Sequence, residues 1–184
     1  MSRAIKLFVL SMLACLLQTE LSRYIRIFTV APDFIIILLT LMTDEYGVFG
    51  GFVAGALMAL FYDSTTGYAP AINLVVYTFI GYMAPFLRQN LNSAFRKFKH
   101  KRFLEFMIIV FSLTMIREII YIGYLFLVGA EQGFSTIFRL FVCVIYSTAL
   151  VVPIAMLVDL HRSRVNRNRA LREKESELKR SNAE

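Results

Sequence analysis

Tryptophan is absent from this chain of 184 residues, and histidine occurs only twice. The two histidines, His100 and His161, both lie in basic segments, and no His-Glu-x-x-His motif is present. No serine in the apolar segments has a histidine that the topology could bring near it, so a nucleophile and its base are not predicted. We therefore expect neither catalysis, nor a bound metal ion, nor a cofactor.

Cysteine is equally scarce. Cys15 and Cys143 stand in separate apolar segments, and no Cys-x-x-Cys pair suggests a disulfide or a metal site. We expect both side chains to pack in the core.

Charged residues make up only 18% of the chain, whereas hydrophobic residues make up 58%, and the mean hydropathy is +0.62. A soluble domain is usually about 45–50% apolar. The apolar excess is gathered in segments long enough to span a bilayer. The composition therefore predicts an all-α integral membrane protein with one compact domain, residues 1–160, and a basic cytoplasmic tail, residues 161–184, that is helical at first and then frays.

The apolar segments predict six transmembrane helices. These helices cover approximately residues 1–20, 34–43, 46–62, 69–87, 103–128 and 136–160.

The net charge of +7 comes mainly from two basic clusters, residues 88–102 and the tail, which follow the fourth and sixth predicted spans. Positively charged loops stay in the cytoplasm, so both termini are expected there. Arg23 and Arg26, after the first span, disagree with this orientation, but the two clusters outnumber them. Because both clusters adjoin spans, we expect them to contact anionic lipids, or a protein partner, and not nucleic acid.

The third predicted span carries a stripe of small residues that ends in a carboxylate. Gly47, Gly51, Gly55, Ala59 and Asp63 follow one another at intervals of four residues. On a helix this spacing forms one face, and small residues allow another membrane helix to approach closely. The partner can be another span of the same chain or the helix of a second protein.

Charged residues within the spans fall at one depth. At a rise of ~1.5 Å per residue, Asp63 lies ~25 Å from the inner end of its span, and Arg117 and Glu118 lie ~22 Å from theirs. Arg139, Gln18 and Glu20 reach a similar height. Because unpaired charges are costly in a bilayer, we expect Asp63 and Glu118 to accept hydrogen bonds from Arg117 and Arg139. Such a polar layer either fastens the helices together or lines an outward-facing cavity for a ligand or a partner helix.

Four motifs follow one another between residues 7 and 85. They are Leu16-Leu17-Gln18, PDFIIILL at residues 32–39, FYDSTTG at residues 61–67 after the glycine-spaced span, and GYMAP at residues 81–85. In order and spacing the chain resembles the bacterial rod shape-determining protein MreD family. The residues that match the family pattern are Pro32, Asp33, Asp63, Gly67, Gly81 and Tyr82. Ala71 and Pro85 depart from it, since the family often has glycine at both positions.

The resemblance implies a six-helix fold similar to the substrate-binding subunit of energy-coupling-factor transporters. It also implies a multi-pass protein of the bacterial cytoplasmic membrane that acts as a non-enzymatic scaffold in the cell-elongation complex and in cell-shape control. The implied partners are MreC, a single-span periplasmic protein, the MreB filament, and two peptidoglycan synthases, a SEDS glycosyltransferase and a class B penicillin-binding transpeptidase.

A vitamin transporter subunit is the alternative function, because it would share the fold. Such subunits usually carry small residues four apart on the first span, where they meet the coupling module. Here that face has Ala4, Phe8, Met12 and Leu16, and the small residues lie on the third span instead. The pattern favours a scaffold.

Overall fold

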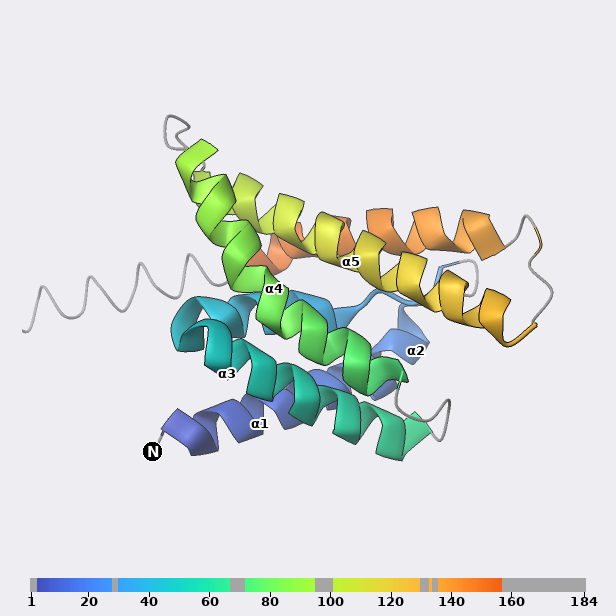
Figure 1. Cartoon of the computed structure of the whole chain (residues 1–184), viewed down its shortest axis with the longest axis horizontal. Helices are drawn as coiled ribbons and strands as arrows, with labels where there is room; N and C mark the ends of the chain where they lie inside the picture. Colours follow the sequence, from blue (N-terminus) through green and yellow to red (C-terminus); the bar gives the residue numbers. More distant parts are fainter. Residues whose placement is uncertain are drawn as a thin grey trace, which may run out of the picture. The chain divides into compact units, whose positions relative to one another are not determined.

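The computed structural model describes residues 3–27, 30–66, 72–94, 101–129, 133 and 136–156, and nearly all of these residues are helical (Figure 1). The labelled elements are α1 (Arg3–Leu16), the π-helical turn η1 (Leu17–Leu21), α2 (Ser22–Tyr24), α3 (Phe34–Thr66), α4 (Ile72–Ala94) and α5 (Lys101–Leu127). One further helix covers Thr136–Met156. The predicted all-α class is confirmed.

The chain divides into two units, Met1–Val151 and Val152–Glu184. The arrangement described below is that of the first unit. The predicted tail, residues 161–184, lies outside the described residues.

Three helical stretches of the described chain are long and apolar enough to cross a membrane. They are Ala4–Tyr24, Phe34–Thr65 and Thr136–Met156. Many large apolar side chains point outward, among them Phe49, Leu60 and Val75, which are 80%, 55% and 65% exposed. In water such side chains would be costly to expose, whereas in lipid they are in a favourable environment. Both observations agree with the expected membrane protein.

Helix α3 is broken at Gly47. This residue has φ 70° and ψ −164°, a conformation open essentially to glycine alone. The chain changes direction there and forms a first segment, residues 34–46, and a second segment, residues 48–66. The sequence predicted two spans separated at Asp44-Glu45; the helical segment in fact continues past both residues, because only the glycine can adopt the required backbone angles. Arg88 of α4 holds Asp44 in an ion pair of 2.7 Å just before the break.

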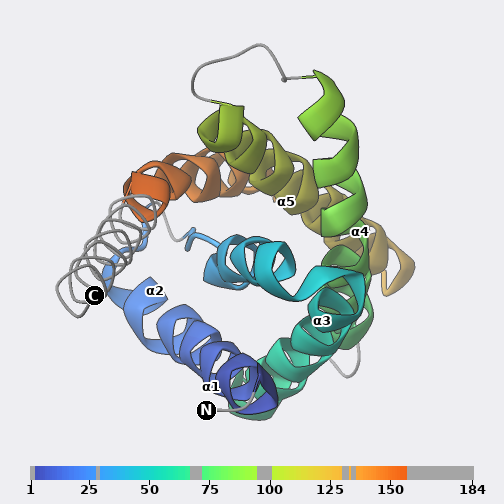
Figure 2. The same ribbon diagram turned by 90° about the vertical axis from the view of Figure 1, so that its left-hand side faces the viewer.

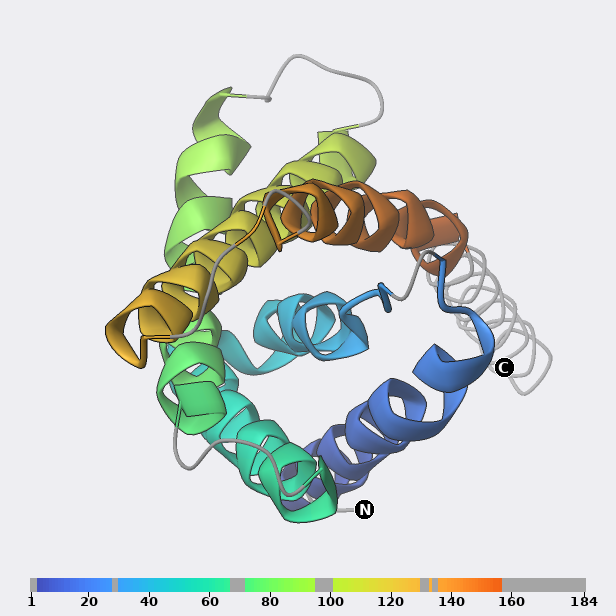
Figure 3. The ribbon, with the colours of Figure 1, turned by 90° about the vertical axis from the view of Figure 1, so that its right-hand side faces the viewer.

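The first segment of α3 is the centre of the unit. Four of its residues, Ile35, Ile36, Ile37 and Leu39, have no exposed surface. Consecutive helical residues point in directions about 100° apart, so burial of three in a row means that neighbours surround the segment. Figures 2 and 3 show it, in light blue, enclosed by α1, the second segment of α3, α4, α5 and the helix Thr136–Met156. At ~1.5 Å per residue it is only about 20 Å long, shorter than the ~30 Å hydrocarbon core.

The second segment of α3 packs against α4 at backbone distance. A Cβ atom added to Gly81 would lie 2.7 Å from the carbonyl carbon of Gly51, and one added to Gly55 would lie 2.8 Å from the carbonyl carbon of Tyr77. Ala59, the next small residue of the stripe, is fully buried. Of the two partners that the stripe left open, the structure places a helix of the same chain, α4, against Gly51 and Gly55.

Gly47 does not belong to this packed face. It occupies the break in α3, and an added Cβ would meet nothing within 4 Å. The small-residue face therefore begins at Gly51, and the regular interval of four at Gly47 is a coincidence of spacing.

Candidate functional site: a buried polar cluster at the start of α3

Asp33 is the N-cap of the central helix. Its Oδ1 atom accepts a hydrogen bond of 3.0 Å from the backbone N–H of Ile36, three residues along the chain. A carboxylate at this position satisfies one of the free N–H groups of the first turn and interacts favourably with the helix dipole. The residue is only 2% exposed, and Pro32 immediately before it is also buried. The helix thus begins inside the unit, with a carboxylate at its tip.

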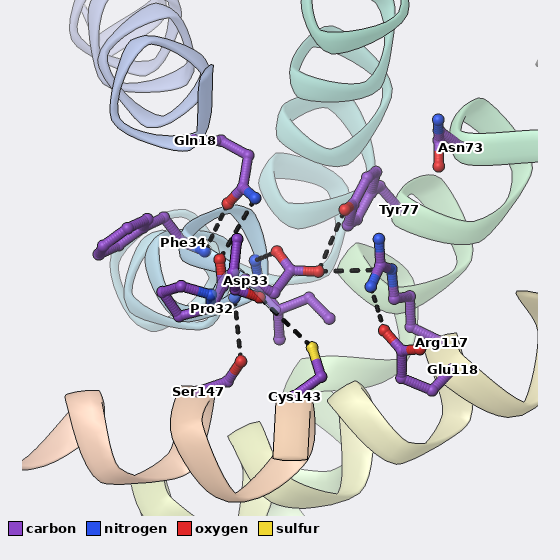
Figure 4. A network of polar contacts seen from close by, with 12 residues as sticks. Gln18, Pro32, Asp33, Phe34, Asn73, Tyr77, Arg117, Glu118, Cys143 and Ser147 are labelled. Carbon is purple, nitrogen blue, oxygen red and sulfur yellow. Dashed lines mark hydrogen bonds and ion pairs between the residues drawn. The ribbon is translucent and has the colours of Figure 1, made fainter. Parts of the chain in front are cut away.

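The second oxygen of Asp33 connects two other helices. Its Oδ2 atom accepts a hydrogen bond of 3.1 Å from the hydroxyl of Tyr77 on α4 and lies 3.5 Å from Nε of Arg117 on α5 (Figure 4). The backbone N–H of Asp33 donates a 2.9 Å hydrogen bond to Oγ of Ser147, on the helix Thr136–Met156. One residue therefore joins the start of α3 to three helices that are remote in sequence.

Gln18 connects the same point to the first helix. Its Nε2 atom donates to the carbonyl oxygen of Pro32 at 3.2 Å, and its Oε1 atom accepts from the backbone N–H of Phe34 at 2.7 Å. Gln18 lies in the π-helical turn η1, where the wider winding changes the direction of side chains relative to a regular helix. Both polar ends of the amide are satisfied, as burial requires.

Arg117 lies close to two carboxylates and an aromatic ring. Its Nη1 atom pairs with Oε1 of Glu118, its Nε atom faces Asp33, and its guanidinium carbon lies 5.9 Å from the ring centre of Tyr121. Figure 4 shows the guanidinium group between the two carboxylates. The cluster contains two carboxylates and one guanidinium group, and the remaining stabilisation of Asp33 comes from hydrogen bonds and the helix dipole.

The cluster holds together helices that are distant from one another in the sequence. Five helical segments supply its members: η1, the first segment of α3, α4, α5 and the helix Thr136–Met156 (Figure 4). Removal of one partner from such a buried charge network leaves another charge uncompensated and typically costs about 3–5 kcal/mol. Among the residues that the structure describes, no group of three or more His, Cys, Asp or Glu side chains could hold a metal ion.

Asp63 does not make the predicted pair with Arg117. Its Oδ1 atom instead accepts a hydrogen bond of 2.6 Å from Nδ2 of Asn73, which joins the end of α3 to the start of α4. Arg117 pairs with Asp33 and Glu118, which are more deeply buried, and attraction between charges is stronger where water is excluded. The predicted pairing of Asp63 with Arg117 was wrong, whereas the predicted pairing of Glu118 with Arg117 is present.

Two other predicted members of the layer, Arg139 and Glu20, are exposed, whereas Gln18 belongs to the cluster. Within the described part of the chain, neither makes an ion pair or a hydrogen bond through its side chain. Depth alone placed them in the layer, but depth does not determine which face of a helix a side chain occupies. Neither residue joins the cluster.

The remaining family-motif residues have separate places. Gly81 provides the close approach of α4 to Gly51, as described above. Tyr82 is 44% exposed and packs on Phe86, with ring centres 5.1 Å apart, so it does not enter the cluster. Gly67 lies outside the described residues.

The sequence analysis did not predict that Asp33 is the centre of the cluster, and it did not predict the partners Tyr77 and Ser147. A signal for Asp33 was available: in the predicted topology the second span begins at the outer surface, so its first residue falls in the same outer half of the membrane as Arg117. Tyr77 and Ser147 carry no comparable signal, because tyrosine and serine are common in membrane helices. The buried positions of Cys15 and Cys143 were predicted correctly.

Comparison of the chain with protein-family models, with curated proteins and with solved structures finds no match.

Proposed function

We propose that this chain is a non-enzymatic scaffold of the bacterial cell-elongation complex, a multi-pass protein of the cytoplasmic membrane with six spans and both termini inside. In this role it binds an MreC-like single-span protein and helps to couple the MreB filament to peptidoglycan synthases. The proposal starts from the MreD-like order of motifs between residues 7 and 85.

The observation that carries the proposal is that the motif residues make the contacts that hold the helices together. Asp33 holds the central helix in contact with α4, α5 and the helix Thr136–Met156. Gln18 binds the backbone on both sides of Asp33, and Gly81 allows α4 to touch α3. Residues that recur as a family motif are expected where a fold cannot tolerate other side chains, and these positions meet that condition.

The interior of the cluster supports a scaffold over a small-molecule binder. Its polar groups satisfy one another: Asp33 uses both carboxylate oxygens, and Gln18 uses both ends of its amide. A binding site for a small polar ligand usually presents convergent polar groups that await their partner. The cluster instead gives a rigid support on which an outer surface can be presented to another protein.

The exposed face of α1 supports the same choice. Phe8, Met12 and Leu16, at intervals of four residues, are 46%, 48% and 50% exposed. A transporter subunit of this fold is expected to have small residues there for contact with its coupling module. Large side chains on this face are better suited to lipid.

The test is affinity purification of the chain from mild detergent, followed by identification of the proteins that accompany it. A single-span protein with a periplasmic coiled coil, recovered in stoichiometric amount, is the expected result. Recovery of an ATPase module together with a bound vitamin would support the transporter instead and would refute the scaffold. A matched sample of the Gly51→Leu variant, in which the α3–α4 contact is disturbed, should recover less of the partner.

A further inference from the structure

The connection between α2 and the central helix is not helical in its described residues, 25–27 and 30–33. We call these residues the strap. Within the strap, Ile27 and Val30 exchange two backbone hydrogen bonds of 3.0 and 2.9 Å. The other backbone groups of the strap need partners from elsewhere, because a polar group away from water is costly to leave without one.

The helix Thr136–Met156 binds the strap at both of its ends. At the first residue, the hydroxyl of Tyr146 donates to the carbonyl oxygen of Ile25 at 2.6 Å. At the last residue, the backbone N–H of Asp33 donates to Oγ of Ser147 at 2.9 Å. Tyr146 and Ser147 are consecutive in the helix, yet they bind positions that are eight residues apart in the chain. We call these two side chains the latch.

The thiol of Cys143 lies at the contact between the strap and this helix. It donates to the carbonyl oxygen of Ala31 at 3.6 Å, and Cys143 is only 5% exposed. Figure 4 shows Cys143 and Ser147 on one side of Pro32-Asp33, with Gln18 on the other side. The thiol is therefore shielded from water as long as the strap stays on the helix.

The helix that carries the latch is held along one face. Its buried residues include Leu140, Cys143, Val144, Ser147 and Val151, and the large side chains that are more than half exposed are Ile137, Phe138, Phe141 and Ile145. The described contacts between this helix and the strap are hydrogen bonds between neutral groups, which are weaker than the charged contacts of Arg117 with Asp33 and Glu118. Segments held by few and weak contacts open locally before the whole fold does.

We propose that the strap separates from the helix Thr136–Met156 in a single local step that admits water to the Asp33 cluster, with Tyr146 and Ser147 as the latch that sets how often this step occurs. Separation frees the carbonyl of Ile25 and the N–H of Asp33 together. Water must then replace their partners, because lipid offers none. The water enters beside the carboxylate on which α4 and α5 converge. The proposal does not depend on the scaffold function.

The two cysteines make a direct test possible. Cys143 lies between the strap and the latch helix, whereas the thiol of Cys15 on α1 donates to the carbonyl oxygen of Met58 on α3 at 3.1 Å. The intact chain in detergent micelles is treated with N-ethylmaleimide, which reacts with a thiol only where the reagent and water reach it. Mass spectrometry then follows the alkylation of each cysteine with time. We expect Cys143 to react faster than Cys15 while the size-exclusion profile of the protein stays unchanged.

Variants of the latch determine whether its hydrogen bonds control the opening. Tyr146→Phe keeps the ring but removes the hydrogen bond to the strap, so it should raise the alkylation rate of Cys143 by about fivefold, the effect of one lost neutral hydrogen bond. Ser147→Ala should have a similar effect and serves as the second variant. Neither change should alter the alkylation rate of Cys15.

Thr148→Val is the matched control on the same helix. The hydroxyl of Thr148 donates to the carbonyl oxygen of Val144 at 2.7 Å, within the helix, so its removal should leave the alkylation rate of Cys143 unchanged. Amide hydrogen exchange of Ile27 and Val30 gives a second measurement. In Tyr146→Phe both amides should exchange about fivefold faster, although the hydroxyl of Tyr146 binds neither of them.

Three results would overturn the proposal. Equal alkylation rates at Cys143 and Cys15 in every variant would mean that both thiols are reached only by unfolding of the whole unit. An increase at Cys143 in Thr148→Val as large as that in Tyr146→Phe would mean that the helix frays without the latch. Faster alkylation of Cys143 without faster exchange at Ile27 and Val30 would mean that the strap does not open with the helix contact.

Discussion

The hydroxyl of Tyr77 donates its hydrogen bond to the same oxygen of Asp33 that faces Arg117, across 44 residues of sequence. Two helices thus converge on one carboxylate oxygen at the tip of the central helix. The other oxygen of Asp33 caps its own helix. A change at Asp33 should therefore affect the start of α3 and its attachment to α4 and α5 together.

Asp33→Asn should lower the free energy of unfolding by about 3 kcal/mol, the lower end for a buried ion pair, because Arg117 keeps Glu118 as a partner. Asp63→Asn is the matched control. It replaces a partly buried carboxylate whose partner is Asn73, and it should cost about 1 kcal/mol. Both values can be measured by unfolding in mixed detergent micelles. A larger loss at Asp63 than at Asp33 would contradict the assignment of the network's centre.

Arg117→Gln and Arg139→Gln should differ sharply. The first leaves the carboxylates of Asp33 and Glu118 buried without a counter-charge and should cost about 3–5 kcal/mol. The second alters an exposed side chain and should change stability by about 0.5 kcal/mol or less. The stabilities of both variants can be compared by thermal unfolding in the same detergent. Equal losses of stability would mean that Arg139 belongs to the network.

Gly51→Leu should disturb the packing of α3 on α4 without altering membrane insertion. A side chain at this position meets the backbone of Gly81, which cannot move aside as a side chain can, and overpacking of this kind costs about 1–3 kcal/mol. Gly123→Leu is the control, because an added Cβ at Gly123 meets nothing within 4 Å. Size-exclusion profiles and unfolding midpoints should change for the first variant and not for the second.

Gly47→Ala tests the break in α3. Space is available for the methyl group, so the expected loss of about 1–3 kcal/mol comes only from the backbone angles, which an L-residue rarely adopts. Gly123→Ala, in a regular helix with equal space, should instead be neutral or stabilise by up to about 1 kcal/mol. If Gly47→Ala proves at least as stable as the unmodified chain, the break does not lie where the structure has it.

The predicted small-residue face and the predicted polar layer had different outcomes for a physical reason. Gly51 and Gly55 are separated by one helical turn, so their common face follows from local geometry, and only a close neighbour can fill it. The partners of Arg117 depend instead on which helices are adjacent and how each is rotated. Depth along the membrane restricts one coordinate of a side chain, and Asp63 and Arg139 show that the other two decide the pairing.

The sequence by itself determined the helical class, the apolar character of the segments, the burial of both cysteines, and the close approach of another helix at Gly51 and Gly55. Each of these follows from local composition and helical periodicity. Only the tertiary structure decided that the short segment 34–46 is central, that Asp33 is the residue on which the helices converge, and that Arg139 faces outward. These outcomes depend on the rotation and order of helices around one another, which the long-range contacts of the folded chain determine.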